Sequence, residues 1–499
     1  MRRLRGVVTA AAAIAVTASM AAVSTVPAGA GTTGGGGTTK VVLPAAGPVA
    51  TVSPLTGGSG IDLVSGAVLP KLPAGWTEAE YRVAGTATAY TSVGPLPTDG
   101  KFALTPTTTA PYATRIVVRR PPADKFNGTV VVEWLNVSGG LDAAPDYTYF
   151  ADELIRAGFA WVGVSAQMIG VEGGPVLVST PVSALGGAGR GLVNIDPARY
   201  GSLHHPGDAY SYDIFTQVAR TLRQPGKVDP LGTLKPKVVL AAGESQSAIM
   251  LTTYIDGVQP LEHAYDGFLV HSRSGAAGPL GSPGQPSEIT ASIGGPPAQI
   301  RTDTDAPVLM VETESDVVGV LDYLPAAQPD TPKIRTWEVA GTAHVDKYQL
   351  GIAATDFGCS EPVNAGPDHF VVASALAHLN TWASGGKAPP EAPRFDIVDG
   401  QYVRDADGII EGGIRTPEVD VPTQVLSSTP SPGGSLACLL AGSTLPLPAS
   451  VLEAKYPTRQ DYLAEYEKSA NTAVSPIGFV LPQDKAALLA DAKPQLIPG

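Results

Sequence analysis

Short apolar runs alternate with amphipathic stretches through the middle of the chain, and this rhythm indicates strands and helices in turn. The runs that predict buried strands are short and rich in β-branched residues, and they lie at residues 128–134, 159–165, 237–242, 266–271, 307–312 and 334–339. Helical periodicity separates or follows these runs, at residues 147–157, 210–222 and 370–382. A strand–helix–strand succession implies parallel pairing through right-handed crossovers. The sequence therefore predicts an α/β fold with a mostly parallel central sheet and helices on both faces.

Two long stretches interrupt this rhythm, and both follow predicted strands. Residues 170–208 and 273–304 are rich in glycine, proline and serine and show little regular periodicity. Ligands bind beyond the carboxyl ends of the strands in open α/β sheets. We therefore expect the two insertions to form a lid or a pocket wall. A C-terminal extension over residues 387–499 is irregular and proline-rich at first and helical near its end.

The first thirty residues have the pattern of a signal peptide. Three arginines lie within the first five residues, an alanine-rich apolar stretch covers residues 7–23, and Ala28-Gly29-Ala30 is a small-residue cleavage signal. Residues 31–60 are expected to form a flexible leader before one large domain over residues 60–499. No later apolar run is long enough to span a bilayer. We therefore expect an exported protein, secreted or kept in the cell envelope, with no membrane span in the mature chain.

Composition argues against several partners and chemistries. The formal net charge of −13 disfavours binding to nucleic acid or to an anionic membrane. The chain contains no C-x-x-C, no H-E-x-x-H and no Gly-Lys-Ser phosphate loop, so no metal and no cofactor are expected. The two cysteines, Cys359 and Cys438, are expected to form one disulfide, because exported proteins with an even cysteine count tend to pair them.

The candidate chemistry lies where the strand at residues 237–242 turns sharply into a helical pattern. The turn reads Gly243-Glu244-Ser245-Gln246-Ser247, which fits the G-x-S-x-G pattern of a serine nucleophile except that serine replaces the last glycine. In that pattern a strained turn holds the serine hydroxyl above the carboxyl edge of the sheet. The last position needs a small side chain, and serine is nearly as small as glycine. Ser245 is therefore a candidate nucleophile, and the alternative is a serine in an ordinary turn.

A serine nucleophile needs a base and a group that orients the base. Ser245 follows one predicted strand, Glu314 and Asp316 follow the second strand after it, and His344 follows the third. This is the chain order nucleophile, acid, histidine, with every member just past a strand end. His344 is therefore the expected base. Asp316 is the preferred acid because of its distance beyond the strand, and Glu314 is the alternative because its longer side chain could reach as far.

Attack on a carbonyl also requires two N–H donors for the oxyanion. One is expected to be the backbone N–H of Gln246, which follows the nucleophile. The other is expected in the glycine-containing loop after the strand at residues 128–134, at Asn136 or Val137. Three further histidines are candidates to line the pocket, namely His204, His205 and His271.

Several segments resemble a bacterial α/β-hydrolase family of exported or cell-associated proteins. They are WLNVSGG (134–140), DPARYGSLHHPGDAYSYDIF (196–215), AAGESQSA (241–248), WEVAGTAH (337–344) and CLLAGSTLPLP (438–448). The resemblance runs from about residue 80 to the end of the chain, so it places the C-terminal extension in the same domain. It implies an α/β-hydrolase fold with Ser245 and His344 as catalytic residues. It does not choose between Glu314 and Asp316, and it implies no particular substrate.

These features together predict a serine hydrolase that cleaves a carboxylic ester, small or polymeric, through an acyl-enzyme. Transfer of the acyl group to an alcohol and hydrolysis of an amide are alternatives that use the same groups. A non-catalytic surface binding module with a relic triad is the alternative from a different class. The intact order of serine, acid and histidine argues against that last alternative.

Overall fold

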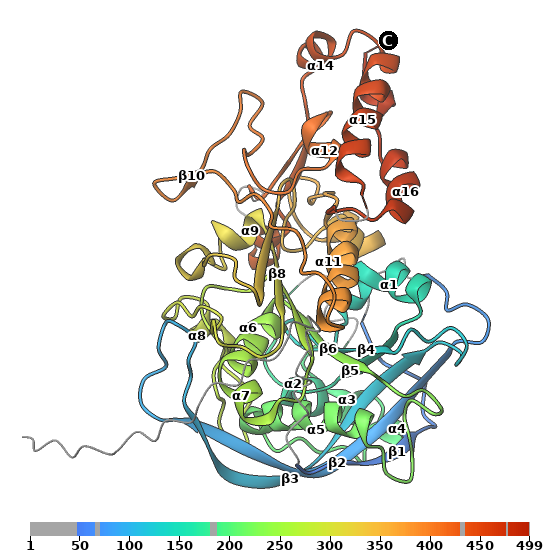
Figure 1. Cartoon of the computed structure of the whole chain (residues 1–499), viewed down its shortest axis with the longest axis vertical. Helices are drawn as coiled ribbons and strands as arrows, with labels where there is room; N and C mark the ends of the chain where they lie inside the picture. Colours follow the sequence, from blue (N-terminus) through green and yellow to red (C-terminus); the bar gives the residue numbers. More distant parts are fainter. Residues whose placement is uncertain (1–46, 65–69, 180–186, 430–434, 476–477, 499) are drawn as a thin grey trace, which may run out of the picture. The chain divides into compact units, whose positions relative to one another are not determined.

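A nine-stranded sheet organises the part of the chain that the structure describes (Figure 1). The computed structural model describes residues 47–64, 70–179, 187–429, 435–475 and 478–498, so the predicted signal peptide lies outside the described residues. The strand order is β1-β2-β3-β5-β4-β6-β7-β8-β9. The strands are β1 (Thr51–Leu55), β2 (Thr77–Ser92), β3 (Leu104–Arg120), β4 (Thr129–Trp134), β5 (Ala160–Val164), β6 (Val238–Glu244), β7 (Gly267–His271), β8 (Val308–Thr313) and β9 (Ile334–Val339).

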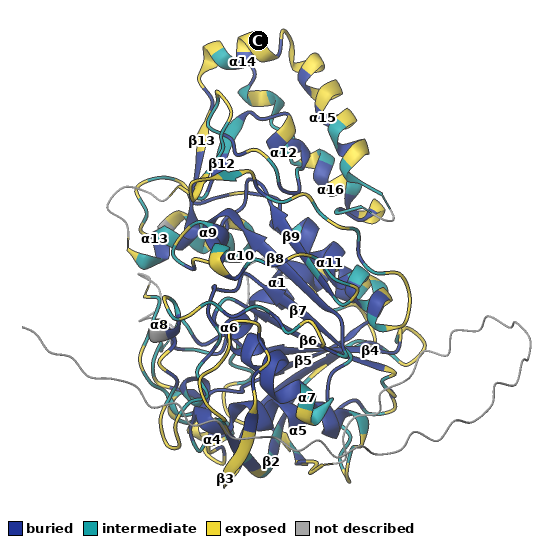
Figure 2. Ribbon diagram, turned by 60° about the vertical axis from the view of Figure 1, so that its left-hand side comes forward, coloured by how far each residue is buried: buried dark blue, intermediate teal, exposed yellow. Residues whose placement is uncertain are grey.

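The predicted parallel sheet is confirmed. β5, β4, β6, β7, β8 and β9 pair in parallel in that spatial order, whereas β1, β2 and β3 are antiparallel and β3 joins β5 antiparallel. Every side chain of β4, β5, β6, β7 and β8 is buried (Figure 2). Burial on both faces explains why these strands appear in the sequence as continuous apolar runs. Their carboxyl ends meet at one edge of the sheet, where the following loops gather.

Helices cover both faces of this sheet, as predicted. On one face α1 (Pro145–Ala157) lies beside α11 (Asp368–Ala383) (Figure 1), and their apolar side chains share one buried cluster with the sheet. On the other face α5 (Ser211–Arg223) and α6 (Gln246–Thr253) contribute to a second, larger cluster. α1 ends at Gly158, where φ is 75° and a Cβ would lie 2.0 Å from a backbone oxygen. Glycine alone fits that position.

Ordered structure begins before the expected boundary at residue 60. The prediction of a flexible leader over residues 31–60 is wrong for its last part, because β1 (Thr51–Leu55) pairs with β2 along its whole length. The β1 sequence TVSPL contains a proline and too few apolar positions to show a strand period. Proline is tolerated there because β1 is an edge strand of the sheet.

The insertions and the C-terminal extension contain short elements that periodicity in the sequence does not reveal. These are α2 (Met168–Glu172), α3 (Leu192–Ile195), α4 (Pro197–Tyr200), α8 (Ile289–Ser292), α12 (Pro417–Asp420), β12 (Gln424–Ser427), α13 (Leu436–Ala441), β13 (Ser443–Pro446) and α14 (Ala449–Lys455). A further short helix, α9 (Glu314–Val317), follows β8 directly. The helical character predicted near the end of the chain is present as α15 (Arg459–Ala473) and α16 (Lys485–Ala490). Among the helices in the described ranges, none combines the length and apolar character needed to cross a membrane.

Cys359 and Cys438, which lie 79 residues apart along the chain, form the predicted disulfide. Cys438 lies in α13, so the bond ties the C-terminal extension to the loop that contains Cys359. Replacing both cysteines with serine is expected to lower the free energy of unfolding by about 2–4 kcal/mol, because the bond restricts the unfolded chain. Urea denaturation measures this loss, and wild-type protein unfolded in reductant should show the same loss. Equal stability of the wild type and the double variant would contradict the expectation.

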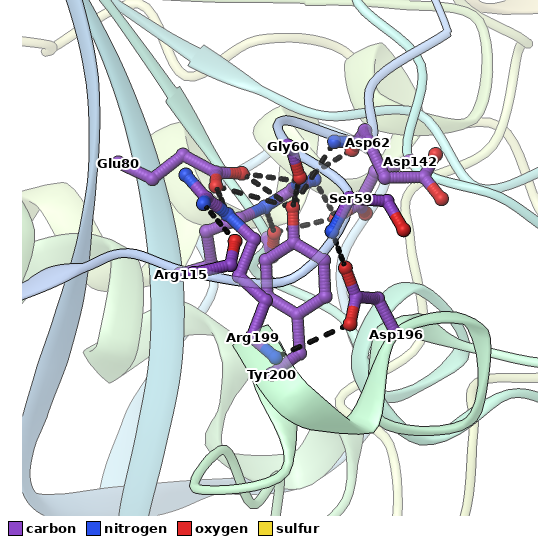
Figure 3. A network of polar contacts seen from close by, with 11 residues as sticks. Ser59, Gly60, Asp62, Glu80, Arg115, Asp142, Asp196, Arg199 and Tyr200 are labelled. Atoms are coloured by element: carbon purple, nitrogen blue, oxygen red, sulfur yellow. Dashed lines mark hydrogen bonds and ion pairs between the residues drawn. The ribbon is translucent and has the colours of Figure 1, made fainter.

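A buried ionic network holds the loop after β4 in place (Figure 3). Arg115, in β3, is fully buried, and its guanidinium donates to Glu80 at 2.9 Å and to Asp142 at 2.7 Å. Asp142 precedes Ala143, which exchanges two backbone hydrogen bonds with Asn136 at 2.8 and 2.9 Å. Arg115 therefore anchors the returning end of the loop that carries Asn136.

Replacing Arg115 with methionine is expected to destabilise the protein by about 3–5 kcal/mol, because two buried carboxylates lose their shared cation. Arg82 is the matched control. It lies opposite Arg115 on β2 and donates to Ser202 O at 3.2 Å in an exposed position, so Arg82→Met should change stability by less than about 1 kcal/mol. Urea unfolding of both variants provides the comparison, and equal losses would refute the role given to Arg115.

Candidate active site

Ser245 lies at the turn between β6 and α6, at the carboxyl edge of the sheet. Its φ of 60° and ψ of −123° lie in a region that non-glycine residues rarely adopt. The turn is held by the Ser245 N–H, which donates to His271 O at 2.9 Å. A Cβ on Gly243 would lie 3.0 Å from the Cβ of Ser247, so the turn needs small residues on both sides. The strained turn predicted from the sequence is therefore present.

The structure brings Ser245, His344 and Asp316 into one hydrogen-bonded row. The Nε2 atom of His344 lies 2.7 Å from Ser245 Oγ, and its Nδ1 atom lies 2.7 Å from Asp316 Oδ1. His344 and Asp316 are both buried. Burial lowers the pKa of His344, but the nearby carboxylates outweigh burial and raise that pKa above its ordinary value. Burial also raises the pKa of Asp316, yet His344 and the hydrogen bonds from Thr313 outweigh it and hold the pKa below its usual range.

Asp316 and Glu314 have different partners although they lie two residues apart. Asp316 is the third residue of α9, and its Oδ2 accepts hydrogen bonds from the N–H and the hydroxyl of Thr313, both at 2.7 Å. Glu314 instead accepts from Gly341 N at 2.7 Å and from Ser428 N at 3.1 Å. Burial raises the pKa of Glu314 to about 6. Glu314 therefore links the turn before His344 to the C-terminal extension, and Asp316 contacts the imidazole.

The loop after β4 lies against the start of α6. Gln246 is the first residue of α6, so its backbone N–H has no acceptor within the helix. The N–H of Val137 donates to the side-chain oxygen of Gln246 at 3.1 Å. The N–H of Asn136 is already engaged with Ala143 O at 2.9 Å. Of the two positions expected from the sequence, Val137 rather than Asn136 therefore has an N–H that faces Gln246.

Glu244, directly before Ser245, is a buried carboxyl that the sequence prediction missed. Its Oε1 atom lies 3.5 Å from His344 Nε2, and the Asn136 side chain donates to its backbone oxygen at 3.1 Å. Burial raises the pKa of Glu244 to about 7. The signal in the sequence was an acidic residue at the end of an otherwise apolar strand.

Removing the Glu244 charge should shift the acid limb of the pH–activity profile. The charge of Glu244 is one of the effects that raise the pKa of His344, and a base must be neutral to accept a proton. Glu244→Gln should therefore lower the pKa of His344 and move the acid limb of kcat/KM toward lower pH. Initial rates of ester hydrolysis between pH 5 and 9 measure the shift. An unchanged acid limb, or a shift toward higher pH, would contradict this role for Glu244.

The side chains of the three other candidate histidines contact residues other than Ser245, and none of the three is among the residues that line the pocket beside it. His204 is exposed, with its Nδ1 3.2 Å from Glu172 Oε1, and His205 is buried with its Nε2 2.9 Å from Ala166 O. His271 is buried, and its two ring nitrogens lie 3.0 Å from Asp146 and 3.1 Å from Asp368.

His271 instead connects two helices that pack together. Asp146 lies in the first turn of α1, and Asp368 begins α11. Burial lowers the pKa of His271, but the hydrogen bonds and charges of these two carboxylates outweigh burial and hold its pKa well above the ordinary value. His271, the last residue of β7, therefore joins the starts of α1 and α11 at the carboxyl edge of the sheet.

A narrow pocket opens beside Ser245 and is almost wholly aliphatic. Its lining consists of Ser138, Leu177, Val178, Ser245, Gln246, Ile249, Ile289, Ile293, Val320, Leu321, Leu436 and Leu440. Each of the two predicted insertions contributes two of these residues, and α13 of the C-terminal extension contributes two more. Among the described residues, no group of three or more histidine, cysteine, aspartate or glutamate side chains is arranged to hold a metal ion. The site can thus offer a serine, an imidazole and a carboxylate next to an apolar wall.

The solved structures that match this chain share little sequence with it. One is from work on two fungal esterases of Rhizomucor miehei, with 13% identity over 60% of this chain and 85% of that chain and a TM-score of 0.30. A putative dienelactone hydrolase from Klebsiella pneumoniae has 12% identity over 61% of this chain and 98% of its own, with a TM-score of 0.30. Esterase Est22 has 12% identity over 63% of this chain and 82% of its own, with a TM-score of 0.31.

The family relationship comes from a match along the sequence. Among curated proteins, none matches this chain. The family model described as an alpha/beta hydrolase domain matches residues 49–490, which include the strands, the site and nearly all of the C-terminal extension. The expected α/β-hydrolase fold is confirmed, and the chain belongs to the alpha/beta hydrolase domain family.

Proposed function

We propose that the protein is a serine hydrolase that cleaves a carboxylic ester. The observation that carries this proposal is the hydrogen-bonded row of Ser245, His344 and Asp316 beside an apolar pocket. A serine hydroxyl is a weak nucleophile until a neighbouring base takes its proton. The pocket supplies a place for the apolar part of a substrate next to that hydroxyl.

In the proposed reaction, His344 Nε2 accepts the proton of Ser245 while Ser245 Oγ attacks the ester carbonyl. Asp316 accepts the Nδ1–H of His344, which fixes the tautomer and stabilises the imidazolium that forms. The oxyanion accepts hydrogen bonds from the backbone N–H groups of Gln246 and Val137, each worth about 3 kcal/mol in the transition state. Because the Gln246 side chain occupies the Val137 N–H in this structure, that side chain must turn away when substrate binds.

The second half of the reaction uses the same groups. His344 gives its proton to the alcohol oxygen, so the C–O bond breaks and the alcohol leaves with Ser245 acylated. Water then attacks the acyl-enzyme, with His344 as the base again, and the carboxylic acid is released. No group beyond those named is needed to balance the protons.

Purified protein should hydrolyse p-nitrophenyl butyrate at least about 10³-fold faster than buffer does. It should act far more slowly on the matching p-nitroanilide, because an amide has the poorer leaving group. A faster reaction with the anilide would make the protein an amidase. No turnover of either compound, together with no reaction with a fluorophosphonate, would support the binding-module alternative.

Acyl transfer to an alcohol is the second candidate, and the apolar lining of the pocket favours it, because such a lining limits access of water to the acyl-enzyme. Adding a primary alcohol to the butyrate assay separates the two reactions. A hydrolase releases mainly butyrate, whereas an acyltransferase accumulates the butyrate ester of the added alcohol.

We further propose that the protein is exported. The N-terminal pattern of a signal peptide supports this, and the disulfide between Cys359 and Cys438 fits an oxidising compartment. N-terminal sequencing of the protein from its native host should find a mature chain that begins just after Ala30. Recovery of the chain with its first thirty residues intact would contradict export by cleavage.

A further inference from the structure

The residues that line the pocket beside Ser245 restrict the chemical class of group that can bind there. Nine of its twelve lining residues are leucine, isoleucine or valine, and the other three are Ser138, Ser245 and Gln246. Every lining residue is thus either aliphatic or uncharged and polar. A charged group placed there would lose its water without gaining a partner, which disfavours charged substrates strongly.

The free space in this pocket is small. Its volume is about 20 Å³, which is room for about one water molecule. A substrate group must therefore displace side chains at the rim, and the cost grows with each carbon added. The lining residues that move least therefore limit the length of the substrate group that the pocket can bind.

One wall is the helix α13. Leu436 and Leu440 lie four residues apart, so they occupy the same face of α13, and both line the pocket. Leu440 is buried and Leu436 is partly exposed. Leu439, in the same helix, is not among the lining residues.

Three contacts fix α13 to the segment that follows His344. Cys438 forms the disulfide with Cys359. The N–H of Val345, next to His344, donates to Leu440 O at 3.2 Å, and the N–H of Asn364 donates to Ala441 O at 2.8 Å. The other side of α13 also packs in a small apolar cluster through Ala437 and Ala441. This wall of the pocket is therefore tied to the segment that directly follows His344 in the chain.

We propose that the pocket binds a short, uncharged aliphatic group of the ester, and that the disulfide-anchored helix α13 limits the length of that group through Leu436 and Leu440. This rests on the proposed ester hydrolysis at Ser245. The group can belong to the acid or to the alcohol, since both present the same hydrocarbon to the pocket. α13 would then be a specificity-determining element supplied by the C-terminal extension.

Two ester series test the proposal in the wild-type protein. The first varies the acyl group of p-nitrophenyl esters from acetate through butyrate and hexanoate to decanoate, and the second varies the alkyl group of acetate esters over the same lengths. In one of the two series, we expect kcat/KM to fall at least about tenfold between the ester with a four-carbon group and the ester with a ten-carbon group. The hemisuccinate p-nitrophenyl ester, with its extra carboxylate, should be at least about 100-fold poorer than the butyrate.

Variants of α13 then test the wall itself. Leu436→Ala and Leu440→Ala should each raise the ratio of kcat/KM for the ten-carbon ester to that for the four-carbon ester (the decyl-to-butyl ratio) by about tenfold or more. The reason is that each substrate methylene that becomes buried raises kcat/KM about fourfold. Leu439→Ala is the matched control and should leave the ratio within about twofold of wild type. The Cys359→Ser, Cys438→Ser double variant should raise the ratio as well, because it releases the wall.

The outcomes separate this proposal from the proposed function. Full activity with short esters, but the wild-type ratio in both folded leucine variants, would overturn the role of α13. A wild-type preference for decyl or hemisuccinyl esters would overturn the assigned substrate class. In both cases reaction of Ser245 with a fluorophosphonate would show that ester hydrolysis itself stands, and absence of that reaction would mean that the proposed function fails instead. Melting temperatures of the variants identify any that do not fold.

Discussion

Ser245→Ala is expected to lower kcat for ester hydrolysis by about 10⁴- to 10⁶-fold, since the residues of such a triad act as a unit. The alanine removes the oxygen that lies 2.7 Å from His344 Nε2 and leaves no atom that can form the acyl-enzyme. Stopped assays with concentrated protein, corrected for hydrolysis in buffer, measure the remaining activity. The melting temperature should change little, because the hydroxyl is part of the site and not of the core.

Ser247→Ala is the matched control for this experiment. Ser247 lies two residues further along the same turn, and its buried hydroxyl has no hydrogen-bond partner among the described residues. Its loss should keep kcat within about tenfold of wild type. If the two variants lost activity equally, or if Ser245→Ala stayed active, the assignment of the nucleophile would be wrong.

Asp316→Asn is expected to reduce kcat by about 10³- to 10⁴-fold with the fold intact. The asparagine can present an N–H to Nδ1 of His344, which favours the tautomer that cannot accept the serine proton. It also removes the negative charge that stabilises the imidazolium. Steady-state kinetics with the best p-nitrophenyl ester measure the effect, and circular dichroism verifies the fold.

Glu314→Gln should behave differently, although Glu314 is only two residues away. The glutamine keeps an oxygen for Gly341 N, which donates to Glu314 Oε1 at 2.7 Å, so kcat should stay within about tenfold of wild type. Any loss of activity should accompany a loss of stability, because Glu314 joins the turn before His344 to Ser428. The reverse pattern, with Asp316→Asn active and Glu314→Gln inactive, would make Glu314 the orienting acid.

The sequence predicted the parts of the site that follow strands. Ser245 comes directly after one buried strand and His344 follows another by five residues. Parallel strands bring their carboxyl ends to one edge of the sheet whatever the conformation of the loops between them. The choice between Asp316 and Glu314 depended on α9, a helix of one turn. Its third residue, Asp316, caps its own first turn and faces His344, whereas its first residue points toward Gly341. The direction in which each side chain of a one-turn helix points leaves no periodic pattern in the sequence.

Other features of the site depended on contacts that the sequence pattern does not reveal. Asn136 appeared as good a donor as Val137 until its N–H was found paired with Ala143. His271 ends a strand, as a pocket residue can, but two buried aspartates engage both of its ring nitrogens. The contribution of α13 to the pocket was hidden because a six-residue helix has too few positions to show a face. The partners of His271 and the other residues of the pocket lie far from these segments in the sequence, whereas the partner of Asn136 lies across the loop after β4.

The most direct test of the central claim is the site of covalent labelling. We expect an alkyl fluorophosphonate to add one phosphonyl group to the native protein, on the tryptic peptide that contains Ser245. Tandem mass spectrometry should place the adduct on Ser245 Oγ, with labelling abolished by Ser245→Ala and strongly slowed by Asp316→Asn. An adduct on a different residue, or equal labelling of wild type and Ser245→Ala, would contradict the account.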